Sequence, residues 1–232
     1  MDEYSDLDLI VVVKDEAYNQ VLKQRKSIAQ RIGFLLDAFT GEHVGESRLL
    51  ICLYDRPLLH VDLKFVSLKD FAVRVEDPVI IWERDSIVSE QLDTIKAVYP
   101  KPDLQWIENR FWIWVHYIAG KIGRGELFDV IESMSFLRST VFGPLILMKS
   151  GAQPQGVRRI ELYGPEYIDD LKKTLPDHTK ISCLHALKAA IALYRRLLSE
   201  PGDEKGSSVN KYLIEKVENY VSDIGRRVII ES

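Results

Sequence analysis

The pattern of hydrophobic and polar positions begins with a strand and a helix. Four apolar β-formers follow one another at Ile10–Val13, and this unbroken run predicts a strand that is covered on both faces. Residues 14–33 then place Ala, Val and Ile at helical spacing. We therefore expect an amphipathic helix over this stretch, with Gly33 as its C-cap.

The rest of the first hundred residues continues to predict strands. Residues 47–66 place two β-rich runs around an Asp-Arg-Pro turn, and this arrangement predicts an antiparallel hairpin. The run VIIWERD at 79–85 predicts a further short strand. The segment YPKPD at 99–103 breaks the pattern, and only helical periodicity follows it. We therefore expect two domains, 1–99 and 100–232.

Apolar stripes at helical spacing occupy four segments of the second half. They run from Ile107 to Ile122, Leu127 to Leu145, Ile181 to Leu198 and Leu213 to Ile224. Breakers separate them at 123–126, 150–156 and 200–208. Four such helices bury their stripes most economically against one another. The expected fold class is therefore α+β, with a mixed β-sheet and its helices followed by a C-terminal α-helical bundle.

Composition and charge exclude several function classes. The net charge is −4 at pH 7 and the basic residues are scattered, which argues against a general nucleic-acid or anionic-membrane surface. Cys52 and Cys183 lie far apart, as expected of reduced core residues in a cytoplasmic protein. The five histidines form no zinc motif, and the most apolar segments are too short to span a bilayer.

Three carboxylates carry the candidate chemistry. Asp6 and Asp8 share one face at the start of the first strand, with Cα atoms about 6.6 Å apart. Asp62 lies in a core-like strand, on one face with His60 and Lys64. If the two strands are neighbours, the three acids can converge on a divalent cation. The alternatives are a solvated turn around the first two acids, and an ion pair of Asp62 with Lys64 or an arginine at a sheet edge.

The motif S-D-x-D-h-x-h-h, followed some fifty residues later by h-D-h in a strand, resembles the DNA polymerase β-type nucleotidyltransferase superfamily. Within it, SDLDLIVVV and HVDLKFV are most similar to aminoglycoside 6-adenylyltransferases and lincosamide nucleotidyltransferases. The resemblance implies transfer of a nucleoside monophosphate, from ATP or another nucleoside triphosphate, to a hydroxyl of a small molecule, with antibiotics among the candidate acceptors. The domain 1–99 would be catalytic, and the domain 100–232 would bind the acceptor.

The resemblance also implies residue roles in the first domain. Asp6 and Asp8 would bind Mg²⁺ or Mn²⁺, and Asp62 would ligate one metal ion and act as the base for the acceptor hydroxyl. Ser5, at the head of the motif, would contact the nucleotide. His60 is expected to be a structural hydrogen-bonding residue beside the site.

Two residues of the first bundle helix are candidate contacts to the acceptor. Lys121 can reach a phosphate or an acidic group, although a lysine there is also typical of a solvated helix face. Tyr117 belongs to an aromatic cluster that can stack on a ligand, although core packing is favoured for its members Trp106, Phe111, Trp112, Trp114 and Tyr117.

The superfamily carries a Gly-Ser motif upstream of its first Asp, and no such motif precedes Asp6 in this sequence. We therefore expect that Met1 is not the first residue of the functional protein, that an apolar patch is exposed beside the first strand, and that the chain binds ATP weakly. A second function stays open on this ground, namely a non-catalytic, regulatory protein of the same fold with an antitoxin-like or partner-binding role. A homodimer is compatible with the sequence.

Overall fold

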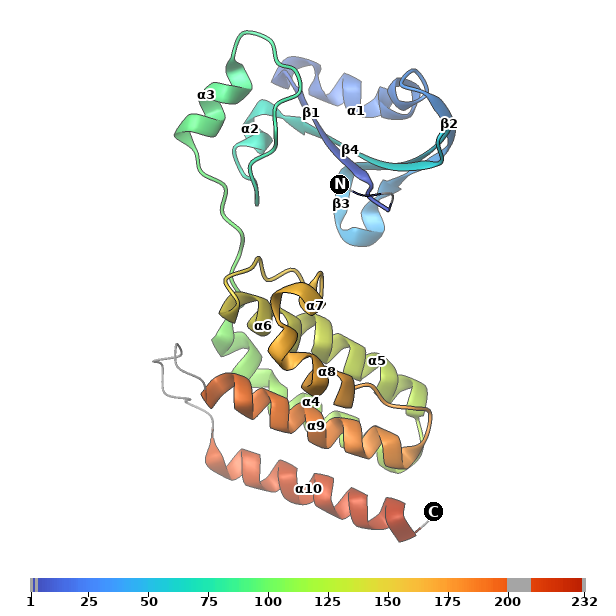
Figure 1. Cartoon of the computed structure of the whole chain (residues 1–232), viewed down its shortest axis with the longest axis vertical. Coiled ribbons are helices and arrows are strands. Elements are labelled where there is room, and N and C mark those ends of the chain that lie inside the picture. The colour runs from blue at the N-terminus through green and yellow to red at the C-terminus, as the bar shows by residue number, and fades with distance from the viewer. Residues whose placement is uncertain (1, 3, 200–209, 231–232) are drawn as a thin grey trace. The chain divides into compact units, whose positions relative to one another are not determined.

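The computed structural model describes residues 2, 4–199 and 210–230, so the predicted breaker at 200–208 lies outside the described residues. The chain divides into two compact units, Met1–Tyr99 and Pro100–Ser232. We call them the sheet unit and the helical unit (Figure 1). With a mixed sheet in one and helices in the other, the chain is an α+β protein.

The sheet unit is built on one four-stranded sheet. Its elements, in chain order, are β1 (Leu7–Val13), α1 (Asp15–Ala29), β2 (Phe34–Gly41), β3 (Glu46–Asp55), β4 (Leu59–Ser67), α2 (Leu68–Phe71) and α3 (Ile87–Thr94). The strand order is β1-β4-β3-β2. β1 runs parallel to β4, whereas β2–β3 and β3–β4 are antiparallel pairs. The mixed sheet and the hairpin of residues 47–66 are thereby confirmed.

The core of the sheet unit lies between α1 and one face of the sheet (Figure 1). Alternate residues of β4, Val61, Leu63 and Phe65, are buried there. The hydroxyl of Tyr54 on β3 donates to the backbone oxygen of Ala29, 2.8 Å away at the end of α1. This buried hydrogen bond satisfies the tyrosine and fixes the end of the helix on the sheet.

The first strand differs from the prediction of burial on both faces. Among the described residues β1 pairs only with β4, so it forms an edge of the sheet. Ile10 is 38% exposed, and Val11–Val13 are only partly buried. Ile10 shares a face with Asp8, whereas Leu9 and Val11 pack on the opposite face against the core. An apolar run alone does not record whether a helix covers both faces of its strand.

The helix after β1 is shorter than predicted, and a strand follows it that the pattern did not predict. α1 ends at Ala29 rather than at Gly33, after which a turn leads into β2. The sequence of β2, FLLDAFTG, has no strict alternation, since its register against β3 shifts between Leu35 and Asp37. A bulge of this kind breaks the period of two on which strand prediction depends.

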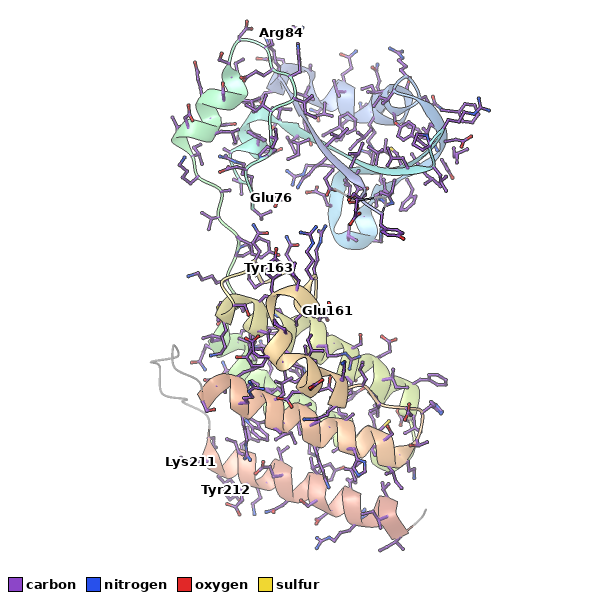
Figure 2. The ribbon with its side chains drawn as sticks, in the orientation of Figure 1. Glu76, Arg84, Glu161, Tyr163, Lys211 and Tyr212 are labelled. Carbon is purple, nitrogen blue, oxygen red and sulfur yellow. The ribbon has the colours of Figure 1, made fainter. Side chains whose placement is uncertain are left out.

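The predicted strand at 79–85 is wrong. These residues form an irregular segment after Pro78, and Ile81 and Trp82 are 83% and 74% exposed. Its polar groups instead cap the next helix, because the Glu83 carboxylate accepts hydrogen bonds from the backbone N–H groups of Val88 (3.1 Å) and Ser89 (3.0 Å). Figure 2 labels Glu76, which precedes this segment, and Arg84, which lies within it.

The helical unit contains the predicted bundle helices and several short ones. Its elements are α4 (Leu104–Arg124), α5 (Leu127–Leu137), α6 (Gly143–Lys149), α7 (Ile160–Tyr163), α8 (Ile168–Lys173), α9 (Lys180–Ser199) and α10 (Lys211–Ile230). The stripe predicted from Leu127 to Leu145 is one helical run with a π-helical turn, Arg138–Phe142, between α5 and α6. The short helices between α6 and α9 were not predicted.

The helices of this unit bury a single large core. Phe111 of α4 stacks on Tyr194 of α9 with ring centroids 3.6 Å apart. One helical run, Leu127–Lys149, is long and apolar enough to cross a membrane by length and composition alone. More than half of its most apolar stretch is buried inside the unit, as is typical of a core helix.

Candidate functional site

The backbone brings two of the three predicted carboxylates side by side. In the parallel pair of β1 and β4, Asp8 is the direct partner of Asp62. Neighbouring strands lie about 4.8 Å apart, so these residues start from adjacent positions on one sheet face. Asp6 precedes β1 by one residue and is exposed, like Asp8. The condition on which the shared site depended, that the strand of Asp62 lies beside the first strand, is thus met.

The acids occupy the sheet face that α1 does not cover. Leu7 and Leu9 alternate with Asp8 along β1 and pack against the core beneath α1. Val61 and Leu63 do the same on either side of Asp62. The Asp62 side chain keeps 22% of its surface exposed, so it lies in a half-buried position that a ligand can reach.

The Asp62 carboxylate contacts a histidine of its own strand. The Nε2 atom of His60 lies 2.8 Å from Oδ1 of Asp62, within hydrogen-bonding distance. The alternative pairing of Asp62 with Lys64 is not what the structure contains, because the Lys64 ammonium lies 2.9 Å from Oε2 of Glu46. His60 is therefore the structural hydrogen-bonding residue. Lys64 pairs with Glu46 and does not form an ion pair with Asp62.

The carboxylates of Asp6, Asp8 and Asp62 are suitable ligands for a hard cation, although their oxygens do not converge on one position. Carboxylate oxygens are the ligands that Mg²⁺ and Mn²⁺ accept most readily in proteins. Within residues 2, 4–199 and 210–230, however, no three His, Cys, Asp or Glu side chains lie close enough together to hold a metal ion. The backbone placement fits a shared cation, and the Asp62 carboxylate would have to turn from His60 to bind it.

Ser5 lies in a tight turn in front of the acids. Its hydroxyl donates to Oδ1 of Asp2 (2.9 Å) and accepts a hydrogen bond from the backbone N–H of Asp2 (2.9 Å). These two hydrogen bonds fix the conformation of the turn that precedes β1. A nucleotide contact from Ser5 would require the hydroxyl to exchange one of these partners.

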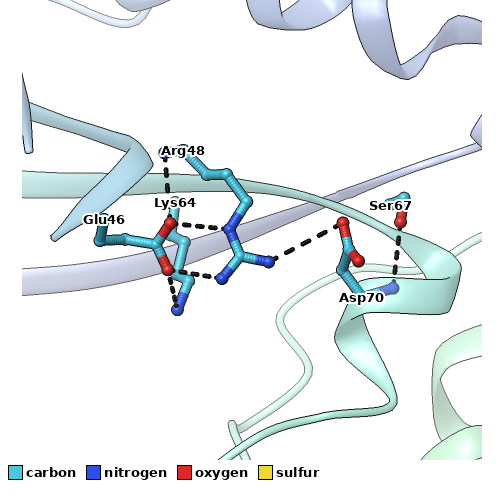
Figure 3. Close-up of polar contacts among 5 residues, drawn as sticks. All are labelled: Glu46, Arg48, Lys64, Ser67 and Asp70. Atoms are coloured by element: carbon cyan, nitrogen blue, oxygen red, sulfur yellow. Dashed lines mark hydrogen bonds and ion pairs between the residues drawn. The ribbon is translucent and has the colours of Figure 1, made fainter. Parts of the chain in front are cut away.

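A charged network connects the start of β3 with the C-terminal half of β4 and with α2 (Figure 3). The Arg48 guanidinium donates two hydrogen bonds to the Glu46 carboxylate, at 2.7 and 2.6 Å, and also lies 3.8 Å from Asp70 of α2. Hydrogen bonds from Arg48, with a further contribution from Lys64, lower the pKa of Glu46 to about 2 despite its partial burial. Glu46 thus holds Arg48 and Lys64, and Arg48 extends the network to Asp70 of α2.

We expect Glu46→Gln to destabilise the sheet unit near neutral pH by about 1–2 kcal/mol, a value reduced for the partial exposure of the ion pair. The folded pKa of Glu46, about 2, lies below its ordinary value of 4.5, so the carboxylate stabilises above the ordinary value. This contribution is lost as the pH falls through the folded pKa. The difference between wild type and variant should therefore shrink between pH 4.5 and pH 2.

Urea unfolding at several pH values, followed by circular dichroism, measures this difference. Glu16→Gln is the matched control, because Glu16 is an exposed residue on α1. A Glu46→Gln deficit that is the same near pH 3 as near pH 7 would contradict the assignment of the effect to this carboxylate.

The two candidate acceptor contacts of the helical unit are already engaged with each other. The Lys121 ammonium lies 2.6 Å from Oδ2 of Asp129 and also pairs with Glu126, and these carboxylates raise the pKa of Lys121. The Tyr117 hydroxyl donates to the same Asp129 oxygen at 3.2 Å. Lys121 therefore ties the end of α4 to the start of α5, and its charge is compensated.

The aromatic cluster divides into two groups. Phe111 and Trp112 are buried in the core of the helical unit, as the packing alternative expected. Trp106 and Tyr117 are 37% and 47% exposed. Helical spacing alone did not separate these two groups, because the stripe of aromatic residues on α4 is wider than the face that the core uses.

The ion pairs of Glu46 and Arg48 were not predicted. Their sequence, GESRLL, carries no motif, and the ion pairs depend on the register between β3 and β4. The only available signal was the presence of charged residues at the start of a predicted strand, which is common at strand ends.

Comparison with known proteins adds little beyond the fold. No protein-family model matches the chain, and no curated protein matches it either. Among solved structures the chain is similar to the crystal structure of an aminoglycoside 6-adenyltransferase from Bacillus subtilis, with 16% identity and a TM-score of 0.44 over 96% of this chain and 89% of that one. A likeness at this level extends to the general fold at most, and not to substrate or mechanism.

Proposed function

We propose that the chain is a nucleotidyltransferase that transfers a nucleoside monophosphate, with ATP as the first candidate donor, to a hydroxyl of a small molecule. The observation that carries the proposal is the pairing of Asp8 with Asp62 on adjacent parallel strands, on the sheet face opposite α1. Two like charges in adjacent positions repel each other unless a cation or a proton lies between them. A site for the metal-bound triphosphate accounts for both carboxylates.

The proposed reaction needs a base for the acceptor hydroxyl and a cation that neutralises charge on the triphosphate. Asp6, Asp8 and Asp62 would hold the divalent cation, which when bound neutralises charge on the triphosphate. The oxygen of the acceptor hydroxyl forms a bond to the α-phosphorus, and the bond from that phosphorus to the pyrophosphate oxygen breaks. The hydroxyl proton passes to Asp62, and pyrophosphate leaves with the electron pair. His60, 2.8 Å from Asp62, would keep this carboxylate oriented when the cation is absent.

The two units have separate roles in this proposal. The sheet unit would be the catalytic domain, the helical unit would bind the acceptor, and an antibiotic is one candidate acceptor among other hydroxyl-bearing small molecules. Cys52 and Cys183 are both buried and unpaired, which supports a location in the reducing cytoplasm. The test is a screen of hydroxyl acceptors with ATP and magnesium, in which acceptor-dependent release of pyrophosphate is the expected result.

Metal binding gives a prediction that is independent of the acceptor. Because a ligand that binds only the native state stabilises it, Mg²⁺ or Mn²⁺ at ten times its dissociation constant should raise the free energy of unfolding by about 1.4 kcal/mol. Thermal unfolding measures the corresponding rise in Tm. Asp8→Asn should remove the rise, whereas Asp37→Asn on β2, where the side chain is 82% exposed, should keep it. An unchanged Tm of the wild type at millimolar metal, with and without ATP, would contradict the site.

A second function is favoured by one observation. The carboxylate side chains do not converge in the described residues, and Asp62 is satisfied by His60, which is also what a non-catalytic, partner-binding protein of this fold would show. Such a protein would give neither a metal-dependent rise in Tm nor pyrophosphate release. The two measurements together therefore distinguish the candidates.

A further inference from the structure

A pocket of about 350 Å³ opens on the helical unit between α4 and α5. Trp114 and Tyr117 of α4 line it from one side, and Glu132 and Phe136 of α5 from the other. Its volume lies in the range of small-ligand sites. Because both walls belong to the same unit, the pocket is defined by the packing of two neighbouring helices.

The aromatic rings in this pocket are held by each other and still reach solvent. Trp114 meets the ring of Phe136 edge-on, with centroids 5.2 Å apart and an interplanar angle of 81°. The Trp106 ring also contacts Trp114, with centroids 5.4 Å apart and an interplanar angle of 59°. Tyr117 and Phe136 remain 47% and 43% exposed. Rings fixed by edge contacts need no reordering on binding, so their exposed surfaces form a preorganised apolar wall.

The charge at the pocket is negative. Glu132 makes no hydrogen bond or ion pair with any of the described residues. Two nearby cations are already engaged. Lys121 pairs with Asp129 at 2.6 Å and lies 5.1 Å from the centroid of the Tyr117 ring, and Arg110 lies over the Trp106 ring at 4.5 Å. The Trp114 and Phe136 walls and the Glu132 carboxylate are thus left without a cation.

We propose that this pocket is a binding site for a small organic cation with an alkylated ammonium head group. Aromatic rings attract such a cation through their quadrupoles, and an unpaired carboxylate supplies the opposite charge. An anion would be repelled by Glu132, and a neutral apolar ligand would desolvate that carboxylate without compensation. The pocket lies in the helical unit, to which acceptor binding is assigned above, but it involves neither Asp8 nor Asp62. Binding of an organic cation can therefore be tested apart from nucleotidyl transfer.

The first experiment titrates the full chain with choline by isothermal calorimetry. Choline is compared with its neutral isostere, in which a tert-butyl group replaces the trimethylammonium group. We expect saturable binding of one choline per chain with a dissociation constant of about 1 mM, and at least about tenfold weaker binding of the isostere. Equal binding of the two would show an apolar docking surface instead, and a lack of saturable choline binding would also overturn the proposal.

Two pairs of variants locate the site. Glu132→Gln and Phe136→Leu should each weaken choline binding by at least about fivefold. The matched controls are Glu161→Gln on α7 (Figure 2) and Phe128→Leu on α5, because both of these residues are exposed and outside the pocket. An unchanged Tm confirms that each variant is folded. Equal losses in the variants and their controls, or no loss in either variant, would place choline elsewhere and overturn the assignment.

Discussion

Asp62→Asn is expected to reduce nucleotidyl transfer by at least about a hundredfold, because the amide cannot accept the proton of the acceptor hydroxyl. The fold should survive, since Asn has the same shape and can keep a hydrogen bond to His60, which now lies 2.8 Å from Oδ1. Nucleotide affinity should fall much less than the turnover number. Steady-state kinetics of pyrophosphate release, together with calorimetric titration of ATP, separates the two quantities.

The outcomes of this experiment assign the role of Asp62. Equal losses of rate and nucleotide affinity would make Asp62 mainly a metal ligand, whereas no loss of either would remove it from the reaction. Asp37→Asn is the control on the same sheet, because its carboxylate is paired with Lys26 at 3.2 Å and lies on β2, away from the β1–β4 pair. It should leave the rate unchanged.

Gly143→Ala is expected to destabilise the helical unit by about 3 kcal/mol or more, a large effect for one methyl group. A Cβ at this position would lie 2.0 Å from the backbone oxygen of Gly156 and 2.9 Å from that of Arg138. Both contacts are with backbone, which cannot rotate away as a side chain can. The methyl group would therefore push apart the start of α6 and the loop around Gly156, and should lower the Tm by on the order of 10 °C.

The matched control is Gly120→Ala on α4. A Cβ at Gly120 would meet only the Tyr220 hydroxyl at 3.4 Å, which is close to an ordinary contact. Alanine is preferred over glycine inside a helix by about 1 kcal/mol, so this variant should be neutral or more stable. Tryptophan fluorescence during denaturation reports mainly on the helical unit, which contains Trp106, Trp112 and Trp114. Loss of stability of similar size in both variants would contradict the steric explanation.

The parts of the fold that the sequence predicts are those with strong periodicity or a distinctive turn. The long helices α4, α9 and α10 follow from apolar stripes, and the β3–β4 hairpin follows from its Asp-Arg-Pro turn. The strand β2 was not predicted, and the irregular segment at 79–85 was wrongly predicted as a strand. In each of these, tertiary contacts decide the structure, namely a bulged register in β2 and the capping of α3 by Glu83.

The candidate site was predictable in its backbone and not in its side chains. Sequence spacing placed Asp8 and Asp62 on two strands, and their pairing follows once β1 and β4 are neighbours. The contacts of Asp62 with His60 and of Lys64 with Glu46 depend on rotamers and on the register of β3, which no local pattern records. The Lys121 ammonium likewise forms an ion pair with Asp129, a residue that belongs to no sequence motif.

The parallel pairing of β1 with β4 also favours one order of folding in the sheet unit. β2–β3 and β3–β4 join segments that are close in the chain, as in the pairing of Tyr54 with Leu59. β1 joins β4 across more than fifty residues, from Leu7 to Val61. Since loop-closure entropy must be overcome before distant contacts form, the three-stranded meander is favoured to fold first and β1 to be added last. In this order of folding, the two carboxylates meet when β1 pairs with β4, so a chain in which only the meander is folded does not present the site.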